Sequence, residues 1–226
     1  MIHLIQCDMN KIVVLVACEE SQAITKEFRK LNQEAYSCDL IPCSGGHPEW
    51  HIQKDAIDEA NSRKYDLMIA HPPCTYIAVS GNRWLYNKDG SRNEERWENR
   101  NKALFFVKQL MDAPIKHIAI ENPIGAISTQ IRKPNQIIQP YMFGDEATKT
   151  TCLWTKNLPL LQPTKIVGKG ERTFFKSGKS HPKWYADILA KSKTAEERRK
   201  LRSKTFLGMA KAIATQYTEY IINLNK

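Results

Sequence analysis

The chain has 226 residues, 42% of them hydrophobic, so it is long enough to bury the core of one domain. No apolar run is long enough to span a bilayer, and no basic leader precedes an apolar stretch, so we expect a cytoplasmic protein. The six cysteines follow no framework spacing and are expected to be reduced. The formal net charge is +10, and residues 151–226 contain 16 Lys and Arg against 5 Asp and Glu. A basic region of this kind is typical of nucleic-acid contact, although an ordinary lysine-rich surface has the same composition.

The first third of the chain has the pattern of a nucleotide-binding unit. Residues 11–17 are a β-branched apolar run, which predicts a strand buried on both faces of a parallel sheet. Apolar spacing predicts a helix over 21–31 with Ser21 as its N-cap. A second strand is predicted over 34–37 and is followed by Asp39. An acid at this place, about 20 residues after the first turn, commonly accepts hydrogen bonds from ribose hydroxyls.

Residues 40–53 are predicted to be a loop. Within and just before it, the spacings of four side chains could bind zinc: Cys38, Cys43, His47 and His51. No second CxxC or His pair supports them, so we predict no metal site. A helix is predicted over 56–63.

Two apolar strands in the middle of the chain each end in a proline turn. Residues 67–70 are followed by His71-Pro72-Pro73-Cys74, and residues 115–120 by Glu121-Asn122-Pro123. Proline cannot donate to a sheet ladder, and it forces the preceding residue out of the helical region, so both strands must stop in stiff turns. We therefore expect the Cys74 thiol and the Glu121 carboxyl at one edge of the sheet. The alternative for Cys74 is a small buried hydrophobe, and the alternative for Glu121 is a solvated strand end.

The remaining elements are predicted from periodicity and from breaker residues. The polar residues after Cys74 predict a loop that could close over a bound base. Helices are predicted over 93–112 and 127–132, and a strand over 136–141, followed by a turn and strand over 143–154. Residues 155–200 are the least regular and the expected insertion, and residues 202–210 are expected to open the last helix.

Pro72-Pro73-Cys74 and Glu121-Asn122-Pro123 resemble the Pro-Cys and Glu-Asn signatures of the C5-cytosine DNA methyltransferases, and the chain is most similar to the short, phage-type members. The resemblance implies a Rossmann-like S-adenosylmethionine (SAM)-dependent methyltransferase fold, an α/β class with a mostly parallel doubly wound sheet and a small irregular insertion. It divides the chain into a catalytic and cofactor-binding domain over 1–154, a small basic insertion over 155–200 that could be a reduced target-recognition region, and a C-terminal helix over 201–226.

The resemblance also implies an activity, namely SAM-dependent methyl transfer to C5 of cytosine in double-stranded DNA. Cys74 would add to C6 of the base, and Glu121 would hold N3 with a pKa raised by burial. The positions that would contact the cofactor are Ala17, Glu19, Ser21, Gln22, Asp39, Leu40, Asp55, Pro72, Gly208 and Met209. Those that would contact the DNA substrate are Pro73, Ser80, Arg83, Trp84, Asn122, Arg132 and Lys149.

The chain departs from the resembled family at the first turn, where the family has Phe-x-Gly-x-Gly-Gly and this sequence has Ala17, Glu19, Ser21 and Gln22 in the same places. Two interpretations of Glu19-Glu20 stay open. The acids could contact the amino-acid end of SAM while free N–H groups of the following helix bind its carboxylate, or they could stabilise the helix dipole.

Two other functions also stay open. The same Cys and Glu chemistry could act on free pyrimidine nucleotides or use another one-carbon donor, and a non-catalytic DNA-binding relative could keep the fold. The proton-abstracting base, the recognised DNA site and the oligomeric state do not follow from the sequence.

Overall fold

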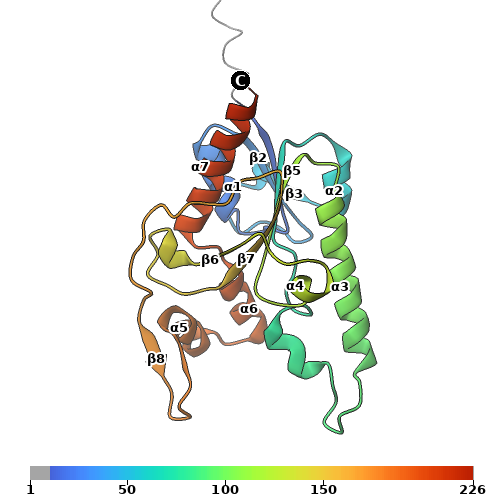
Figure 1. Cartoon of the computed structure of the whole chain (residues 1–226), viewed down its shortest axis with the longest axis vertical. Coiled ribbons are helices and arrows are strands. Elements are labelled where there is room, and N and C mark those ends of the chain that lie inside the picture. Colours follow the sequence, from blue (N-terminus) through green and yellow to red (C-terminus); the bar gives the residue numbers. More distant parts are fainter. Residues whose placement is uncertain (1–10, 226) are drawn as a thin grey trace, which may run out of the picture.

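The centre of the molecule is a seven-stranded, mostly parallel sheet, seen in a computed structural model that describes residues 11–225 (Figure 1). The strand order is β3-β2-β1-β4-β5-β7-β6, and β7 runs antiparallel to both of its neighbours. This confirms the expected Rossmann-like α/β fold. The first ten residues, which carry the prediction of no leader, lie outside the described range. The strands are β1 (Val13–Ala17), β2 (Glu34–Asp39), β3 (His51–Gln53), β4 (Leu67–Ala70), β5 (His117–Asn122), β6 (Gln136–Ile138) and β7 (Thr151–Lys156).

Helices cover both faces of this sheet, which is why β1, β4 and β5 are apolar without alternation. One face packs against α1 (Ala23–Lys30) and α7 (Leu207–Leu224), with Phe28 and Tyr217 fully buried between them. The other face packs against α2 (Ala56–Ser62), α3 (Glu94–Asp112) and α4 (Ile127–Gln130). Among the described residues, no helix combines the length and the apolar character that crossing a membrane requires.

The order of the strands places a switch point between β1 and β4. From β1 the chain builds outward through β2 and β3, and then returns to add β4 and β5 on the other side. The parallel register pairs Ala17 with Ala70, and Ala70 with Ile120, so three strands end at the same edge of the sheet. In open α/β sheets, ligands bind at this edge, beside the switch point.

Residues 155–206 are more regular than the sequence suggests. They contain a hairpin of β8 (Arg172–Phe174) and β9 (Ser180–Pro182), followed by α5 (Lys183–Lys191) and α6 (Ala195–Ser203). The last helix opens within the expected stretch 202–210, but only at Leu207, because residues 202 and 203 still belong to α6. A long-range contact sets this start, since the Asp145 carboxylate accepts a hydrogen bond from Gly208 N at 2.9 Å.

Smaller differences follow from individual residues. The strand predicted over 136–141 ends at Ile138, because Pro140 opens a 3₁₀ turn, η3 (Pro140–Met142). Two other 3₁₀ turns, η1 (Pro48–Trp50) and η2 (Val79–Trp84), lie in the loops after β2 and β4. The division of the chain at 154 and 200 stays a prediction.

Candidate active site

The proline turns after β4 and β5 lie side by side at the carboxyl edge of the sheet. Three hydrogen bonds join them. The Asn122 side-chain amide donates to Pro72 O at 2.7 Å, Val79 N donates to Ile124 O at 3.1 Å, and Ala126 N donates to Ile77 O at 2.7 Å. These bonds fix the backbone on which Cys74 and Glu121 are carried.

Gly125 allows the two turns to approach this closely. A Cβ atom at residue 125 would lie 2.0 Å from the carbonyl oxygen of Ile77, which is far inside van der Waals contact. Only glycine fits between these backbones. The loop after Cys74 is anchored from the other side, because the Arg96 guanidinium donates to Thr75 O at 2.8 Å.

Cys74 is exposed to solvent, and its thiol is within electrostatic reach of Glu121. Partial burial of the sulfur raises the pKa of the thiol, and the negative charge of Glu121 raises it further. Arg202 and Lys149 act in the opposite direction, and the net pKa lies above that of an ordinary cysteine. In the unliganded protein the group is therefore mainly a thiol at neutral pH.

Glu121 forms a pair with His71. The two side chains are 17% and 14% exposed, and His71 Nδ1 lies 3.1 Å from Glu121 Oε2. Burial raises the pKa of Glu121, but the hydrogen bond and charge of His71, the Lys149 ammonium and the Thr151 hydroxyl outweigh it, so the net pKa is lowered. The expected raised pKa is thus wrong. An ionised carboxylate only accepts hydrogen bonds, so His71 Nδ1 carries the proton of this pair.

Two buried polar atoms beside this pair have no hydrogen-bond partner among the described residues. They are His71 Nε2 and Asn122 Oδ1. Buried polar atoms in native proteins are almost always paired, so unpaired ones at a strand-end edge favour a site that a ligand or solvent completes.

Two members of this site were not predicted from the sequence, namely His71 and Arg202, whereas Thr151 was expected with Lys149 as a phosphate contact. His71 had a local signal, because it directly precedes the Pro-Pro-Cys motif and ends an apolar strand. Arg202 had none, because α6 brings it to the edge from far along the chain. Lys149, predicted as a phosphate contact, lies near both Cys74 and Glu121, and its ammonium donates to Lys204 O at 3.1 Å.

The predicted substrate-contacting residues Ser80, Arg83 and Trp84 lie in η2, which begins five residues after Cys74. Ser80, Arg83 and Trp84 are all exposed, and the Arg83 guanidinium stacks 4.5 Å from the centre of the Trp84 ring. Pro73 is exposed, whereas Pro72 is buried. Arg132 is engaged elsewhere, since it donates to Asn135 Oδ1 at 2.7 Å and to Thr155 O at 3.0 Å.

The turn between β1 and α1 is closed by its own side chains. The Glu19 carboxylate accepts hydrogen bonds from Ile24 N at 2.7 Å and from Thr25 N at 3.3 Å, and it also binds the Thr25 hydroxyl. The expectation that these helix N–H groups are free for a ligand carboxylate is therefore wrong, and Glu19 stabilises the helix start instead. Ser21 is not the N-cap, because Gln22 takes that position in a left-handed conformation with φ 56°.

Gln22 holds the loop after β2 against this turn. Its side-chain amide donates to His47 O at 2.7 Å and to Ser37 Oγ at 3.2 Å, and its oxygen accepts from His47 N at 3.1 Å. Gln22 is fully buried, so these bonds exclude water. Ala17, at the end of β1, is also buried.

Two of the predicted cofactor-contacting acids lie together at the ends of β2 and β3. Asp39 and Asp55 both act on the Cys18 thiol, whose pKa is raised first by burial and then by these charges. Asp55 also caps α2 through Ile57 N at 2.7 Å. Leu40 follows Asp39 and is exposed. Gly208 and Met209 open α7, and Met209 is buried in the core.

Two of the four candidate zinc ligands, His51 and Cys38, contact other groups. His51 has both ring nitrogens engaged, with Ser37 Oγ at 2.8 Å and with Ile41 O at 2.9 Å. Cys38 is buried with its sulfur 3.4 Å from Lys54 O. Over residues 11–225 no group of three His, Cys, Asp or Glu side chains has the arrangement of a metal site.

Comparison with known proteins found no matching family model and no matching curated protein. One solved structure that aligns with the chain is described as a candidate DNA modification methyltransferase encoded within a prophage of E. coli. The identity is 13% and the TM-score 0.43, and the alignment covers 70% of this chain and 52% of that one. The chain thus spans about half the length of this structure.

Proposed function

We propose that this protein transfers a methyl group from SAM to C5 of cytosine in DNA, with Cys74 as the nucleophile. The observation that carries the proposal is that hydrogen bonds join the turn that carries Cys74 to the turn that carries Glu121, at the carboxyl edge of β4 and β5. The charge of Glu121 also raises the pKa of the Cys74 thiol. Nucleophilic catalysis on a pyrimidine needs these two groups, one for C6 and one for N3.

The first step forms a bond between sulfur and C6. The C5=C6 double bond opens, and the electron density moves toward N3, where a proton must meet it. The ring then reacts as an enamine whose C5 would take the methyl group of SAM while the methyl–sulfonium bond breaks, so that S-adenosylhomocysteine leaves. Loss of the C5 proton, return of the N3 proton and cleavage of the sulfur–C6 bond restore the aromatic base and the thiolate.

The pairing of His71 with Glu121 suits the N3 position. The Glu121 carboxylate is ionised, and the proton of the His71–Glu121 pair lies on His71 Nδ1, in the hydrogen bond between the two side chains. A base whose N3 faces Glu121 can share that proton. As the charge on Glu121 falls, its effect on Cys74 falls too, and the thiolate becomes easier to form. The positive charges of Lys149 and Arg202 also lower the pKa of Cys74 and so favour its thiolate.

The residues at the edge fit an adenosine better than they fit a ligand carboxylate. Asp39 and Asp55, which lie together beside Cys18, would hold the ribose hydroxyls and the adenine amino group. The α1 N-terminus would not hold the amino-acid end, because Glu19 occupies its donors. SAM, when bound, supplies the electrophilic methyl group.

Double-stranded DNA is the substrate that the surroundings favour. The carboxyl edge lies between two projections in Figure 1, one formed by η2 and the loop before α3, the other by β8, α5 and α6. The second carries much of the basic excess of residues 151–226. Because C5 and C6 are stacked in a duplex, the cytosine must be flipped out, at a cost of a few kcal/mol that phosphate contacts would offset.

Label from methyl-tritiated SAM tests the proposal. The full-length protein is incubated with duplex DNA or with free cytidine nucleotides, and the products are separated as nucleosides. Label in 5-methylcytosine from DNA is expected. Cys74→Ser should remove it while DNA retention on a gel persists, and Cys43→Ser should leave it unchanged.

Other outcomes distinguish the alternatives. Label only in free nucleotides would replace DNA as the substrate, and gel retention without any label would support a non-catalytic DNA-binding protein. A duplex containing 5-fluorocytosine gives a second readout, because a fluorine at C5 cannot leave as a proton. The expected result is a stable adduct at the peptide that contains Cys74, and an adduct elsewhere would show that the nucleophile is wrong.

A further inference from the structure

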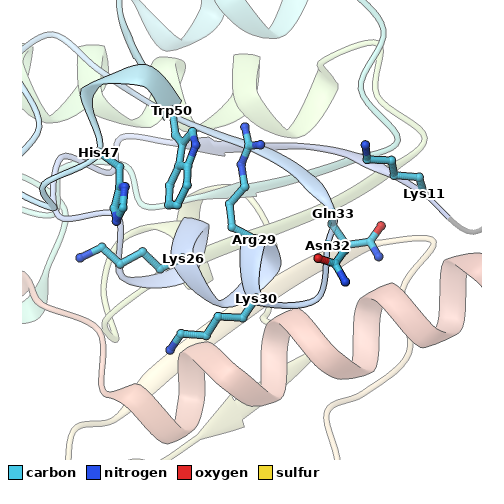
Figure 2. A pocket seen from close by; sticks show the side chains of 8 residues that line it. All are labelled: Lys11, Lys26, Arg29, Lys30, Asn32, Gln33, His47 and Trp50. Carbon is cyan, nitrogen blue, oxygen red and sulfur yellow. The ribbon is translucent and has the colours of Figure 1, made fainter.

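A hollow of about 530 Å³ runs along the outer side of α1, on a part of the surface that the proposed reaction does not use (Figure 2). Four of its lining side chains are cations, and no carboxylate of the described residues lines it. We call it the α1 groove and define it by Lys11, Lys26, Arg29, Lys30, His47 and Trp50.

The cations of the α1 groove are poorly neutralised. Within residues 11–225, the ammonium groups of Lys11 and Lys26 have no acidic partner within ion-pair distance. Lys30 pairs with Glu27 at 2.5 Å, but its side chain is 65% exposed and so remains accessible. Glu49 pairs with His47 at 3.0 Å and its charge also acts on Arg29, so Lys11 and Lys26 are the groove cations that have no acid beside them within residues 11–225. Cations without matching acids attract an anion.

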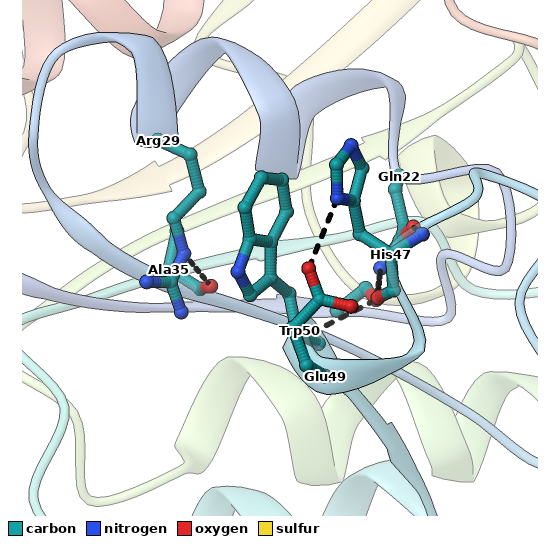
Figure 3. Close-up of polar contacts among 7 residues, drawn as sticks. Gln22, Arg29, Ala35, His47, Glu49 and Trp50 are labelled. Carbon is teal, nitrogen blue, oxygen red and sulfur yellow. Dashed lines mark hydrogen bonds and ion pairs between the residues drawn. The ribbon is translucent and has the colours of Figure 1, made fainter.

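The aromatic residues of the groove are already stacked. Trp50 lies between His47, whose ring is 3.8 Å away and nearly parallel, and the Arg29 guanidinium, which lies 5.1 Å from its centre (Figure 3). Arg29 also lies 4.9 Å from the Tyr36 ring and donates to Ala35 O at 2.8 Å. Because both faces of Trp50 are covered, the groove offers charge to a ligand and no platform for a base.

The cations are spread out and do not converge on one point. Lys26 and Lys30 lie one turn apart on α1, Arg29 points away from them toward Trp50, and Lys11 lies beyond the end of the helix (Figure 2). A compact anion would need convergent donors, so this spread fits an extended polyanion.

An ion pair links the candidate active site to the start of the α1 groove. On α6, Arg202 acts on the Cys74 thiol, and the Lys200 ammonium lies 3.8 Å from the Glu20 carboxylate. Glu20 belongs to the turn that opens α1, six residues before Lys26. The start of the groove therefore lies toward the carboxyl edge, whereas Lys11, which precedes β1, lies toward the opposite edge of the sheet.

From these observations we propose that the α1 groove binds the sugar-phosphate backbone of the DNA duplex away from the target cytosine. The proposal rests on the proposed function in that DNA is the partner. The contacts would be independent of sequence, and they would strengthen binding through counterion release.

The test compares two triple variants that lose the same charge. One is Lys11→Ala with Lys26→Ala and Lys30→Ala, and the other replaces three exposed lysines outside the groove: Lys64→Ala, Lys108→Ala and Lys116→Ala. Arg29 is left in place because its stacking supports the fold. The affinity of the full-length protein for a duplex is measured between 50 and 200 mM salt, conditions over which phosphate contacts dominate the change.

The groove variant should show a salt slope that is shallower by about two to three, since each lost phosphate contact lowers it by roughly 0.9. The control variant should keep the wild-type slope, and equal melting temperatures would show that both are folded. Equal slopes for the two variants would overturn the proposal.

The experiments distinguish failure of the groove proposal from failure of the proposed function. If the wild type methylates DNA and the two variants have the same slope, only the groove proposal falls. If the groove variant shows the shallower slope but the wild type transfers no methyl group, the enzymatic proposal falls and the groove stands.

Discussion

The turns after β4 and β5 differ from the turn after β1 in how their polar groups are satisfied. At the first two, His71 Nε2 and Asn122 Oδ1 are buried and have no hydrogen-bond partner within residues 11–225, and a thiol is exposed in the same pair of turns. At the third, the carboxylate of Glu19 and the amide of Gln22 are fully engaged by the chain itself. All of these turns end parallel strands at one edge of the same sheet.

The difference separates a place that binds a ligand from a place that holds the scaffold. An unpaired buried group costs free energy that a ligand can recover, whereas a group already paired gains little from a new partner. We therefore expect substitutions at the β4 and β5 turns to change chemistry first, and substitutions at the β1 turn to change stability first.

Glu121→Gln should have the largest effect. The amide keeps the shape but cannot hold the N3 proton, so single-turnover methyl transfer should fall by about 10²- to 10⁴-fold. The Cys74 thiol should become more reactive toward iodoacetamide, because the negative charge that raises its pKa is gone. These opposite changes would not arise from a merely structural role.

Glu49→Gln provides the control, since Glu49 is exposed, pairs with His47 in the loop after β2, and is not among the charges that shift the pKa of Cys74. If Glu121→Gln lowers both methyl transfer and Cys74 alkylation, the carboxylate only supports the fold. The β5 turn would then resemble the β1 turn, which holds the scaffold and binds no ligand.

Gly125→Ala should have the next largest effect. The added Cβ would lie 2.0 Å from the Ile77 carbonyl and force the two turns apart, at a cost of about 1–3 kcal/mol in the free energy of unfolding. Urea unfolding measures it, and Gly168→Ala is the matched control, because that Cβ would meet no atom within 4 Å. Equal midpoints for the two variants would mean that the turns are less tightly joined than the hydrogen bonds indicate.

Local patterns predicted the β4 and β5 turns because the information is local. An apolar run and a proline after it decide where each strand stops, and parallel pairing then brings Cys74 and Glu121 to one edge. The lowered pKa of Glu121 could not be predicted, because His71 and Lys149 reach it from elements about 50 and 28 positions away in the sequence. The residue roles in the methyl-transfer proposal stay predictions. They include the roles of Arg132 and Met209 as ligand contacts.

The β1 turn was misread for a different reason. Helix-start rules favour a small polar N-cap, and Ser21 fits them, whereas the structure uses a carboxylate three residues before the cap position. The break between α6 and α7 was missed because Asp145, more than 60 residues away, provides the acceptor. Local sequence rules do not contain such contacts.

Glu19→Ala tests the assignment of the β1 turn to the scaffold. It removes the acceptor of two helix N–H groups and the Thr25 hydroxyl, so the free energy of unfolding should fall by about 2 kcal/mol. SAM affinity, measured by calorimetry on the folded variant, should change little. Glu98→Ala, in an exposed pair with Lys102, is the control for a lost carboxylate. Unchanged stability with lost SAM binding would reverse the assignment and make Glu19 a ligand contact.

Arg202→Ala should have the smallest effect. It tests whether a charge from the C-terminal third of the chain lowers the pKa of the Cys74 thiol. The positive charge of Arg202 lowers the pKa of Cys74, so its removal raises that pKa and reduces the thiolate fraction below the pKa. Alkylation of the Cys74 peptide should slow a few-fold at pH 8, and the difference should vanish at a pH well above the pKa, where both thiols are ionised. Arg172→Ala, whose guanidinium binds Ser180 in the β8–β9 hairpin, should leave the profile unchanged. A pH-independent slowing by Arg202→Ala would instead indicate an altered approach to the sulfur, and α6 would then shape access to the site without tuning its charge.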